Sequence, residues 1–534
     1  MRRLLAAVAF FATWSSGAHA WTVDGITADP QRLVAAIGVV LFYVAASVLL
    51  SMRHAARKRV AEGLSATDGA AGSVLVAYAS QTGYAEQIAN STLRALSVAN
   101  VPSRMVSFAD LDDDVLRKAE IALFVVSTTG EGDPPDPAVR FVRSVMRSPV
   151  VAPGLRYGVL ALGDRSFTRF CAFGDAVDRW LAERNATRMF DAIRVNNGDP
   201  DTLALWWQRV GELTGSKVDA EPAAATSAWT LAARTVANPN NPEHAACHVT
   251  LRPQGAAQVW EAGDVAVIEV RNDPAEVASL LEKLGFEGTL QLESGGRVLA
   301  LSEHLMMREL PQSDAEIVAL ARMSPALLLK SLKLLRPREY SIASLPEDGG
   351  IELLVRQARR PNGRLGVGSG WLTQYAGVGD TVALSIRANS AFHAPPADRP
   401  LILIGNGTGI AGLRAHIKAR AEAGATRNWL FFGERTAAGD FFYRDDIAKW
   451  RVARVLERCD FAFSRDGEQR SYVQDCVRRR AYDVRAWIAD GAAIYVCGSL
   501  QGMSGAVNDV LGEIVGAQVL QELVETGRYR RDVY

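Results

Sequence analysis

The chain has 534 residues, and its 59 lysines and arginines match its 59 aspartates and glutamates, so the formal net charge is zero. This length predicts about three domains, and the charge balance argues against a nucleic-acid-binding protein, whose binding face usually leaves a basic excess. The five cysteines form no CxxC pair. That spacing argues against a disulfide framework, an iron–sulfur cluster or a thiolate zinc site, so no metal site is predicted.

The N-terminal segment has the pattern of a membrane-targeting sequence. Two arginines precede an apolar run, and small residues end at Ala20, so residues 1–20 are predicted to be a signal sequence or a first membrane helix. A second apolar stretch, residues 33–51, has about the shortest length that crosses a bilayer, and a basic cluster follows it. We therefore expect a transmembrane anchor in the bacterial inner membrane, with the later domains facing the cytoplasm. The alternative is that this stretch is a buried core helix.

The first soluble region opens with an apolar run at residues 74–78, which predicts a buried parallel strand. The run ends in Ser80-Gln81-Thr82-Gly83, where hydroxyls and backbone N–H groups lead into a predicted helix and suit a phosphate. The segment lacks the lysine of a Walker motif, which favours a phosphate monoester over a nucleoside triphosphate. Taken alone, the same residues also fit an ordinary helix N-cap.

Two further strand-to-loop junctions follow in the same region. A strand predicted at residues 121–126 leads into a loop at 128–132, and a strand at 157–161 leads into a loop at 163–167. Because the carboxyl ends of parallel strands meet at one edge of an open α/β sheet, all three loops should converge on one crevice. Glycines allow the backbone to approach a flat ring closely, and Phe167 offers a face for stacking.

These three loops, in this order, resemble those of the flavodoxin-like FMN domain of diflavin reductases, which we expect over residues 73–216. The resemblance implies that the first loop holds the FMN phosphate and that the other two surround the isoalloxazine ring. The alternative is an α/β domain that binds no flavin. The residues implied are Ser80, Gln81, Thr82, Gly83, Thr128, Thr129, Gly130, Glu131, Gly132, Gly163, Asp164 and Phe167.

An alternating pattern after residue 260 predicts a β-barrel. Within it, Arg338 and Tyr340 are two residues apart on a predicted strand and therefore share one face. An arginine there can grip a pyrophosphate with two hydrogen bonds, beside an aromatic ring. Gly366, Ser369 and Trp371 belong to a stretch of small residues that opens a helix and suits a second pyrophosphate contact. Each pattern alone also fits a strand with a helix cap.

The last region opens with a predicted strand at residues 401–404 and a glycine-rich turn that contains Gly407 and Thr408, a weak dinucleotide signal by itself. Further on, Ser464, Arg465 and Arg470 suit a dianion such as the 2′-phosphate of NADPH. A solvated basic edge would explain the same arginines.

The C-terminal part contributes two more candidates. Cys497 ends an apolar strand, where an inert buried thiol is the default interpretation. The sequence ends on the aromatic residue Tyr534, which indicates that this side chain packs at a specific place.

The order of these motifs resembles the ferredoxin–NADP reductase module of diflavin reductases, nearest to their bacterial NADPH–sulfite reductase branch and next to their NADPH–cytochrome (haemoprotein) reductase branch. The resemblance implies an FAD-binding β-barrel with a short helical connecting region over residues 228–390, then a Rossmann-like NADP-binding domain over 398–534. It places Arg338, Tyr340, Ser341, Gly366, Ser369 and Trp371 at FAD, and Gly407, Thr408, Arg435, Ser464, Arg465, Arg470, Tyr472 and Gln474 at NADPH. It implies that Ser341, Cys497 and Asp532 surround the nicotinamide and that Tyr534 stacks on the flavin.

Two features of the sequence, one residue and one region, depart from the family pattern. Gly412 stands where the family commonly has proline, and the connecting region, residues 272–335, is shorter than usual. The overall expectation is a membrane-anchored NADPH-dependent diflavin reductase that moves electrons through FAD and FMN to a one-electron acceptor. A haemoprotein is the expected partner, a ferric chelate the alternative, and a non-catalytic flavoprotein sensor or scaffold a remote third. No nucleic-acid partner is expected.

Overall fold

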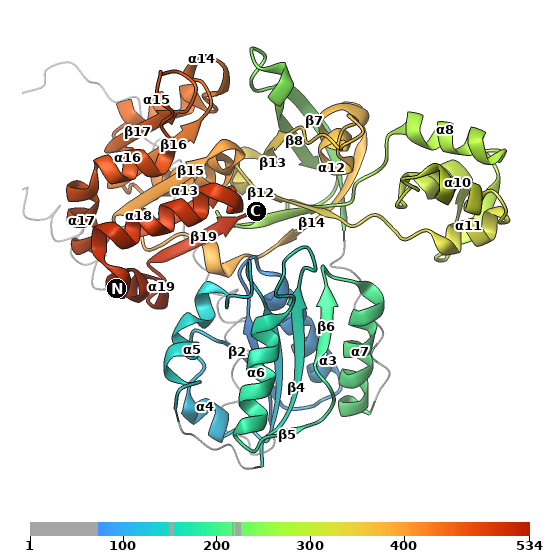
Figure 1. The fold of residues 1–534 in the computed structure, drawn as a ribbon, viewed down its shortest axis with the longest axis horizontal. Coiled ribbons are helices and arrows are strands. Elements are labelled where there is room, and N and C mark those ends of the chain that lie inside the picture. Colours follow the sequence, from blue (N-terminus) through green and yellow to red (C-terminus); the bar gives the residue numbers. More distant parts are fainter. Residues whose placement is uncertain (1–72, 149–153, 216–217, 219–225) are drawn as a thin grey trace, which may run out of the picture. The chain divides into compact units, whose positions relative to one another are not determined.

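The computed structural model describes residues 73–148, 154–215, 218 and 226–534. These residues belong to one compact unit of the chain. They contain three larger β-sheets and a two-stranded hairpin, with helices packed against them (Figure 1).

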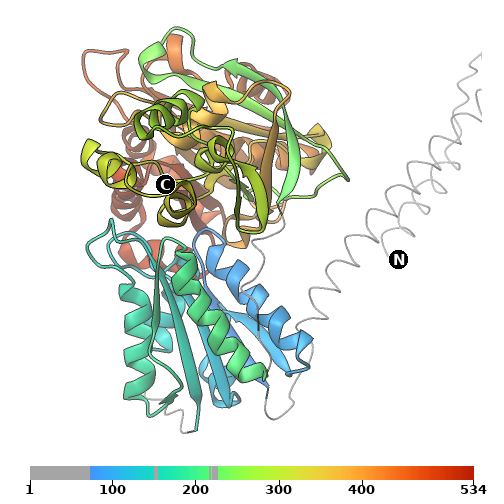
Figure 2. The same ribbon diagram turned by 90° about the vertical axis from the view of Figure 1, so that its right-hand side faces the viewer.

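The first sheet is parallel, and helices cover both of its faces (Figure 2). Side chains alternate along a strand, so Val74 and Val76 pack with helices α3 and α7 while Leu75 and Ala77 pack with α4, α5 and α6. Burial on both faces explains why these strands are continuously apolar in sequence. The strands run in the order β2-β1-β3-β4-β5, with β6 paired to β4, and the order reverses between β1 and β3, where open α/β sheets bind ligands. The elements are β1 (Val74–Ala79), α3 (Tyr84–Val98), β2 (Ser103–Ser107), α4 (Asp113–Arg117), β3 (Ile121–Ser127), η1 (Asp136–Ala138), α5 (Val139–Ser144), β4 (Arg156–Gly163), α6 (Ala172–Glu183), β5 (Thr187–Arg188), β6 (Ile193–Asn196) and α7 (Pro200–Thr214).

The second sheet is antiparallel, with six strands in the order β12-β9-β14-β7-β8-β13. Its core contains Trp229, Trp260 and Leu353, all at most 5% exposed. Its strands are β7 (Ser227–Val236), β8 (Ala246–Pro253), β9 (Val265–Ile268), β12 (Arg338–Ser341), β13 (Ile351–Arg356) and β14 (Thr381–Arg387). The short helix α12 (Val367–Gly370) packs against this core through Val367 and lies close to Arg338 of β12 at Gly368.

Between β9 and β12 lies a small helical region with its own apolar core, which includes Leu281, Leu305 and Leu328. Its elements are α8 (Pro274–Leu284), the hairpin of β10 (Gln291–Ser294) and β11 (Arg297–Ala300), α9 (Leu301–Met306), α10 (Asp314–Leu320) and α11 (Pro325–Ser331). Glu276 of α8 forms ion pairs with Arg360 and Arg364, which attach this region to the loop before α12.

The third large sheet is parallel, in the order β17-β16-β15-β18-β19, and is also covered on both faces. Helices α13 and α15 lie on one face, and α16, α17, α18 and α19 on the other. The bounds are β15 (Leu401–Asn406), α13 (Ile410–Glu422), β16 (Asn428–Glu434), α14 (Ala437–Asp440), α15 (Arg444–Val452), β17 (Arg458–Phe463), α16 (Val473–Arg479), α17 (Ala481–Ala489), β18 (Ala493–Gly498), α18 (Gly505–Val515), α19 (Ala517–Glu525) and β19 (Tyr529–Val533).

The predicted membrane anchor is corrected. Among the described residues, no helix combines the length and the apolarity needed to cross a bilayer. The segments from which the anchor was predicted, 1–20 and 33–51, lie outside the described residues. The expected placement in the bacterial inner membrane, with the membrane as a partner, is therefore not upheld. The α/β sheets of the fold class, by contrast, are present as expected.

Candidate functional site

The first candidate site lies at the carboxyl end of the first sheet, where β1 and β3 are neighbours. Ser80 follows β1, and Thr128 and Thr129 follow β3. Their side-chain oxygens are buried, and none has a hydrogen-bond partner among the described residues. A buried hydroxyl without a partner costs about 1–3 kcal/mol, so three such groups at one edge of a sheet favour a polar ligand there. The phosphate of a flavin fits this donor set.

Two other residues of the predicted phosphate loop use their polar groups elsewhere. The Gln81 side chain donates from Nε2 to the carbonyl oxygen of Arg531, at 2.8 Å. The carbonyl oxygen of Thr82 accepts from Nε of Arg387, at 3.0 Å. Gly83 has a φ of +82° and caps the start of α3. The structure therefore leaves the buried Ser80 hydroxyl without a partner among the described residues but engages the Gln81 amide with Arg531.

The loops after β3 and β4 lie side by side. The Glu131 carboxylate accepts from the backbone N–H of Thr168, at 3.1 Å, which joins the two loops. Gly130 and Gly132 have φ values of +49° and +108°, in the region that favours glycine. The other predicted ring contacts in these loops are Gly163, Asp164 and the half-buried Phe167.

The second candidate site is formed by β12 of the barrel and the small residues of α12. A Cβ at Gly368 would lie 2.6 Å from Cγ of Arg338 and 3.0 Å from the Tyr340 hydroxyl, so only glycine allows this approach. Gly366 is the N-cap of α12, and the Ser369 hydroxyl donates to its carbonyl oxygen, at 3.3 Å. The structure thus gathers the predicted FAD residues Arg338, Tyr340, Gly366 and Ser369 in one place.

Trp371 differs from these neighbours because its side chain belongs to the barrel core. It is 6% exposed and packs with the apolar residues of the sheet. The guanidinium of Arg271 lies 5.8 Å from the ring centroid. This tryptophan therefore packs beneath the site in the barrel core and has no exposed face on which a ring could stack.

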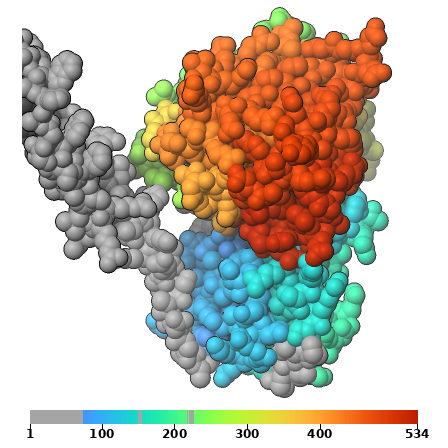
Figure 3. Space-filling view, turned by 90° about the vertical axis from the view of Figure 1, so that its left-hand side faces the viewer, coloured from blue at the N-terminus to red at the C-terminus, as the bar shows by residue number. Residues whose placement is uncertain are grey.

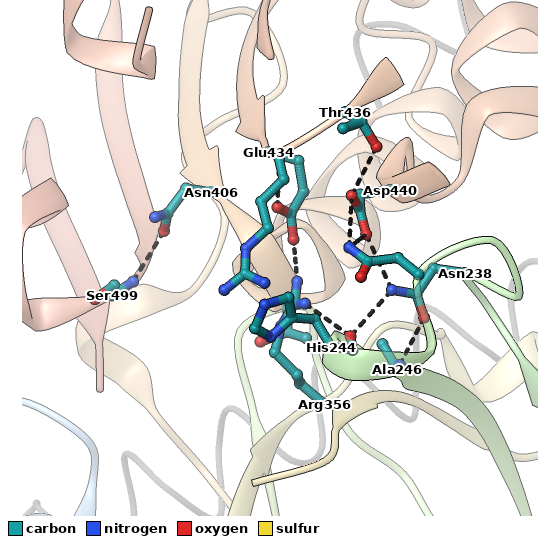
Figure 4. Close-up of polar contacts among 12 residues, drawn as sticks. Asn238, His244, Ala246, Arg356, Asn406, Glu434, Thr436, Asp440 and Ser499 are labelled. Atoms are coloured by element: carbon teal, nitrogen blue, oxygen red, sulfur yellow. Dashed lines mark hydrogen bonds and ion pairs between the residues drawn. The ribbon is translucent and has the colours of Figure 1, made fainter. Parts of the chain in front are cut away.

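The glycine-rich turn after β15 packs closely on β18. Gly407 has a φ of +56°. A Cβ at Gly409 would lie 2.2 Å from the carbonyl oxygen of Cys497, so the turn can reach β18 only with glycine at this position. The Asn406 side chain accepts from the backbone N–H of Ser499, at 3.0 Å, and holds the ends of the two strands together (Figure 4).

Arg435 and Arg465 are neighbours beyond β16 and β17, where the backbone N–H of Arg465 donates to the carbonyl oxygen of Arg435 at 2.8 Å. The Nη1 atom of Arg435 is buried and has no acceptor within the described part of the chain. Burial, and then the positive charge of Arg465, lowers the pKa of Arg435. Because like charges repel unless an anion lies between them, this pair suits a phosphate. Ser464 follows β17 directly, and the other predicted 2′-phosphate residues on this edge are Arg470, Tyr472 and Gln474.

The third candidate site is the point where β12, β18 and β19 meet. The Ser341 hydroxyl donates to the Asp532 carboxylate at 2.8 Å, and the Cys497 sulfur lies 3.7 Å from the same oxygen. The Tyr534 hydroxyl is 3.3 Å from the Thr408 hydroxyl. Residues from the barrel and from the parallel sheet are therefore brought together in one cluster.

Burial sets the electrostatics of this cluster. It raises the pKa of Asp532 above its ordinary range, although the hydrogen bonds from Ser341 and Cys497 oppose the shift. Burial and the nearby Asp532 also raise the pKa of the Cys497 thiol. Gly412 sits against the cluster, since a Cβ there would lie 3.1 Å from the Cys497 sulfur. Helix α13 begins at Ile410 and continues through Gly412, so the glycine that replaces the family's proline does not interrupt the helix.

One charged residue beside the glycine-rich turn was missed by the sequence interpretation. Arg356, at the end of β13, forms an ion pair with Glu434, and its Nη1 donates to the His244 carbonyl oxygen at 3.0 Å (Figure 4). A Cβ at Gly407 would lie 3.8 Å from its Nη2. The barrel thus places a guanidinium beside the glycine-rich turn. The only sequence signal was a basic residue at the end of an apolar strand.

A second missed feature is the polar network that surrounds Asp440, whose side chain is fully buried. Asn238, Asn241 and Thr436 donate to its carboxylate at 2.9–3.0 Å (Figure 4). Burial favours the neutral acid, but these hydrogen bonds outweigh it and lower the pKa of Asp440. The network fastens the turn after β7 to the parallel sheet that carries Arg435.

Comparisons with known proteins agree with this arrangement. The flavodoxin family matches residues 76–207, and the oxidoreductase NAD-binding domain family matches residues 403–509. The sulfite reductase [NADPH] flavoprotein alpha-component of Vibrio cholerae serotype O1 is 30% identical, with 87% of this chain aligned to 88% of that protein. Proteins of the same name from Photobacterium profundum and Neisseria meningitidis are 28% and 30% identical, over 87% and 86% of this chain and 89% of their own lengths.

The matches extend from the first sheet to the last and cover the loops described above. They confirm the predicted resemblance, the oxidoreductase class and the cofactor set of FMN, FAD and NADPH. The roles of individual residues remain predictions. The chain belongs to the family of the NADPH–sulfite reductase flavoprotein alpha-component.

Proposed function

We propose that this chain transfers electrons from NADPH through FAD and FMN to a one-electron acceptor, and that the acceptor is a haemoprotein. The observation that carries the proposal is the convergence of Ser341, Cys497 and Asp532 from three strands into one buried cluster beside the glycine-rich turn. When bound, NADPH supplies a hydride, and each flavin can accept two electrons and release them singly.

The chain's own residues have the following proposed parts. Arg338, Tyr340, Gly366 and Ser369 hold the FAD pyrophosphate, with Trp371 as support beneath them. Ser80, Thr128 and Thr129 donate to FMN, and the adjoining glycines allow the backbone to approach its ring. Arg435 and Arg465 bind the 2′-phosphate of NADPH.

At the junction, Asp532 is proposed to orient the nicotinamide and to stabilise the positive charge that develops on it. Ser341 keeps the carboxylate in place by its hydrogen bond, at 2.8 Å. Tyr534 is proposed to cover the cluster and to move aside when a nicotinamide enters. The residue is 59% exposed. Its backbone N–H donates to the carbonyl oxygen of Gly498 at the end of β18, and its carbonyl oxygen accepts from the backbone N–H of Leu500 in the turn that follows.

The acceptor is proposed by analogy with the relatives. Those proteins are named as the alpha-component of sulfite reductase, so each acts as one part of a larger enzyme. We extend this to a haemoprotein partner that takes electrons one at a time. Reduction of a ferric chelate is the alternative acceptor reaction.

The test uses the purified full chain. Bound FMN and FAD are counted after denaturation, and reduction of cytochrome c and of a ferric chelate is followed with NADPH and with NADH. One of each flavin, with preferential use of NADPH and reduction of cytochrome c, would support the proposal. If only the ferric chelate were reduced, the proposed acceptor would be a ferric chelate and not a haemoprotein. A chain that holds flavin but never oxidises NADPH would return the sensor or scaffold interpretation.

A further inference from the structure

Strand β19 has two faces with different partners. It is the last strand of its sheet, paired on one side only with β18. The Asp532 side chain points into the cluster with Ser341 and Cys497. Side chains alternate along a strand, so the preceding residue, Arg531, points the opposite way. Its guanidinium forms an ion pair with Asp136 of η1, in the region of the first sheet.

Gln81 completes this contact. Its Oε1 accepts from the backbone N–H of Asp136 at 2.8 Å, and its Nε2 donates to the Asp136 carboxylate at 3.1 Å. The same Nε2 lies 2.8 Å from the Arg531 carbonyl oxygen, a group on the open edge of β19. Gln81 and Asp136 are 8% and 6% exposed. The three residues thus form a closed and largely buried network, which we call the docking cluster.

A second contact holds the same loop from the barrel side. Arg387, at the end of β14, is 5% exposed and donates to the Glu339 carboxylate with Nη1 at 2.7 Å. Its Nε donates to the Thr82 carbonyl oxygen at 3.0 Å. Glu339 lies between Arg338 and Tyr340 on β12. The loop that carries Ser80 therefore contacts β19 directly and is connected to β12 through the Arg387 side chain.

The fit at this contact is close. A Cβ at Gly83 would lie 2.1 Å from the carbonyl oxygen of Ala388. Helix α19 packs on η1 and α5 beside it, and the space-filling view shows the C-terminal residues directly against the first sheet's residues (Figure 3). At the rim of the contact, Arg143 pairs with Glu525 at 3.2 Å, with the arginine side chain 45% exposed.

We propose that Arg531, Asp136 and Gln81 are positioning residues for electron transfer between the two flavin sites. The docking cluster fixes the first loop against the strand that also carries Asp532, so both sites are held in one arrangement. This inference rests on the proposed function. In the step itself, reduced FAD loses one electron and FMN gains it, and the three residues exchange no atoms.

The experiment compares Arg531→Met, Asp136→Asn and the double variant, all in the full chain. Hydrogen exchange of peptides that cover residues 80–84 and 387–391 reports the docked contact without reference to flavin chemistry. Rapid-mixing absorbance with NADPH separates hydride transfer from the later electron transfer between flavins. We expect faster exchange in both peptides and a second phase slowed about tenfold or more, since small misplacements cost this much. Hydride transfer should stay within about twofold of wild type, because neither residue takes part in the contacts among Ser341, Cys497 and Asp532 that position the nicotinamide.

Electron transfer between the flavins should be no slower in the double variant than in the slower single variant, because both substitutions remove the same contact, the Arg531–Asp136 ion pair. Arg531→Lys keeps the charge but lacks the planar fork, so its effects should fall in between; it also serves if Arg531→Met folds poorly. Arg143→Met, which removes the exposed rim pair, is the matched control and should behave as wild type.

Wild-type exchange and wild-type second phase in Arg531→Met would overturn the inference, as would an equal effect of Arg143→Met. Failure of the proposed function is distinguishable. A wild-type chain without FMN would refute that function, whereas the exchange measurement would still decide whether the docking cluster holds the loop.

Discussion

The two polar centres at the ends of the two parallel sheets are built in opposite ways. At the first, the oxygens of Ser80, Thr128 and Thr129 are buried without partners among the described residues. At the second, Ser341 and Cys497 both contact the Asp532 carboxylate. The first centre is completed only by a ligand, while the second is satisfied within the protein. One arrangement therefore leaves hydroxyl groups available to a ligand at a cost in stability, whereas the other holds a buried carboxyl group in place for chemistry.

The largest expected effect is on the satisfied centre. Asp532→Asn keeps the shape of the side chain but removes its charge, so we expect hydride transfer from NADPH to slow by about 10²–10³-fold, as for the loss of one preorganised electrostatic contact. Rapid-mixing absorbance of flavin reduction measures it. Asp490→Asn, which breaks an exposed pair with Arg427, is the control. An unchanged hydride-transfer rate in Asp532→Asn would remove Asp532 from the site.

The next effect concerns the pair of arginines. Arg435→Met removes one of two like charges, so NADPH should bind about 10–100-fold more weakly because a charged hydrogen bond to phosphate contributes about 1.5–3 kcal/mol. The Michaelis constant for NADH should not change. Steady-state kinetics with both nucleotides measure this. Equal effects on NADPH and NADH would contradict a 2′-phosphate role.

Two matched serine substitutions then separate the centres directly. Ser80→Ala removes an unpaired hydroxyl, so without FMN the free energy of unfolding should stay the same or rise, by up to about 1 kcal/mol. Ser341→Ala removes a donor from a buried carboxylate and should lower the free energy of unfolding by about 1–3 kcal/mol. Chemical denaturation of the flavin-free chains measures both.

The same Ser80 substitution should have the opposite effect on FMN binding. Ser80→Ala should weaken FMN binding about tenfold, the loss expected for one hydrogen bond to a charged group. Fluorescence titration of the flavin-free chain with FMN measures the dissociation constant. If Ser80→Ala lowered stability and left FMN binding intact, the contrast between the two centres would be refuted.

The last effect concerns the pH dependence of stability at Asp532. Burial raises its pKa in the folded protein, so the neutral acid is favoured there and the contribution of this group to stability is lost as pH rises through the raised pKa. Asparagine does not titrate. The stability of Asp532→Asn relative to wild type should therefore improve from pH 4 towards pH 7, by about 1.4 kcal/mol for each unit of the pKa shift. Denaturation at several pH values checks the direction. A relative loss with rising pH would contradict the desolvated carboxylate.

The sequence located the loops well because each follows a continuously apolar strand. In a parallel sheet the carboxyl ends of such strands meet at one edge, so Ser80 and Thr128 could be placed together from spacing alone. The direction of individual side chains could not be inferred in this way. The amide of Gln81 turns to Arg531, 450 residues away in sequence, and Trp371 turns into the barrel core.

Arg356 and Asp440 were missed for a related reason. Each acts through partners that are distant in sequence: Glu434 lies 78 residues from Arg356, and Asn238 lies 202 residues from Asp440. Local patterns carry no information on such pairs. The membrane prediction is not upheld: no helix within the described residues could span a bilayer, and the segments on whose hydropathy it rested lie outside them.

The close approach at Gly83 has a consequence for how this family can vary. A side chain at position 83 would meet a main-chain oxygen, the carbonyl of Ala388, which every amino acid shares. No replacement at position 388 can relieve that overlap, so no compensating mutation exists there. Among homologues that dock in this way, position 83 should be invariant while position 388 drifts. An alignment of such homologues would then show a constant glycine at position 83 and no covariation between positions 83 and 388.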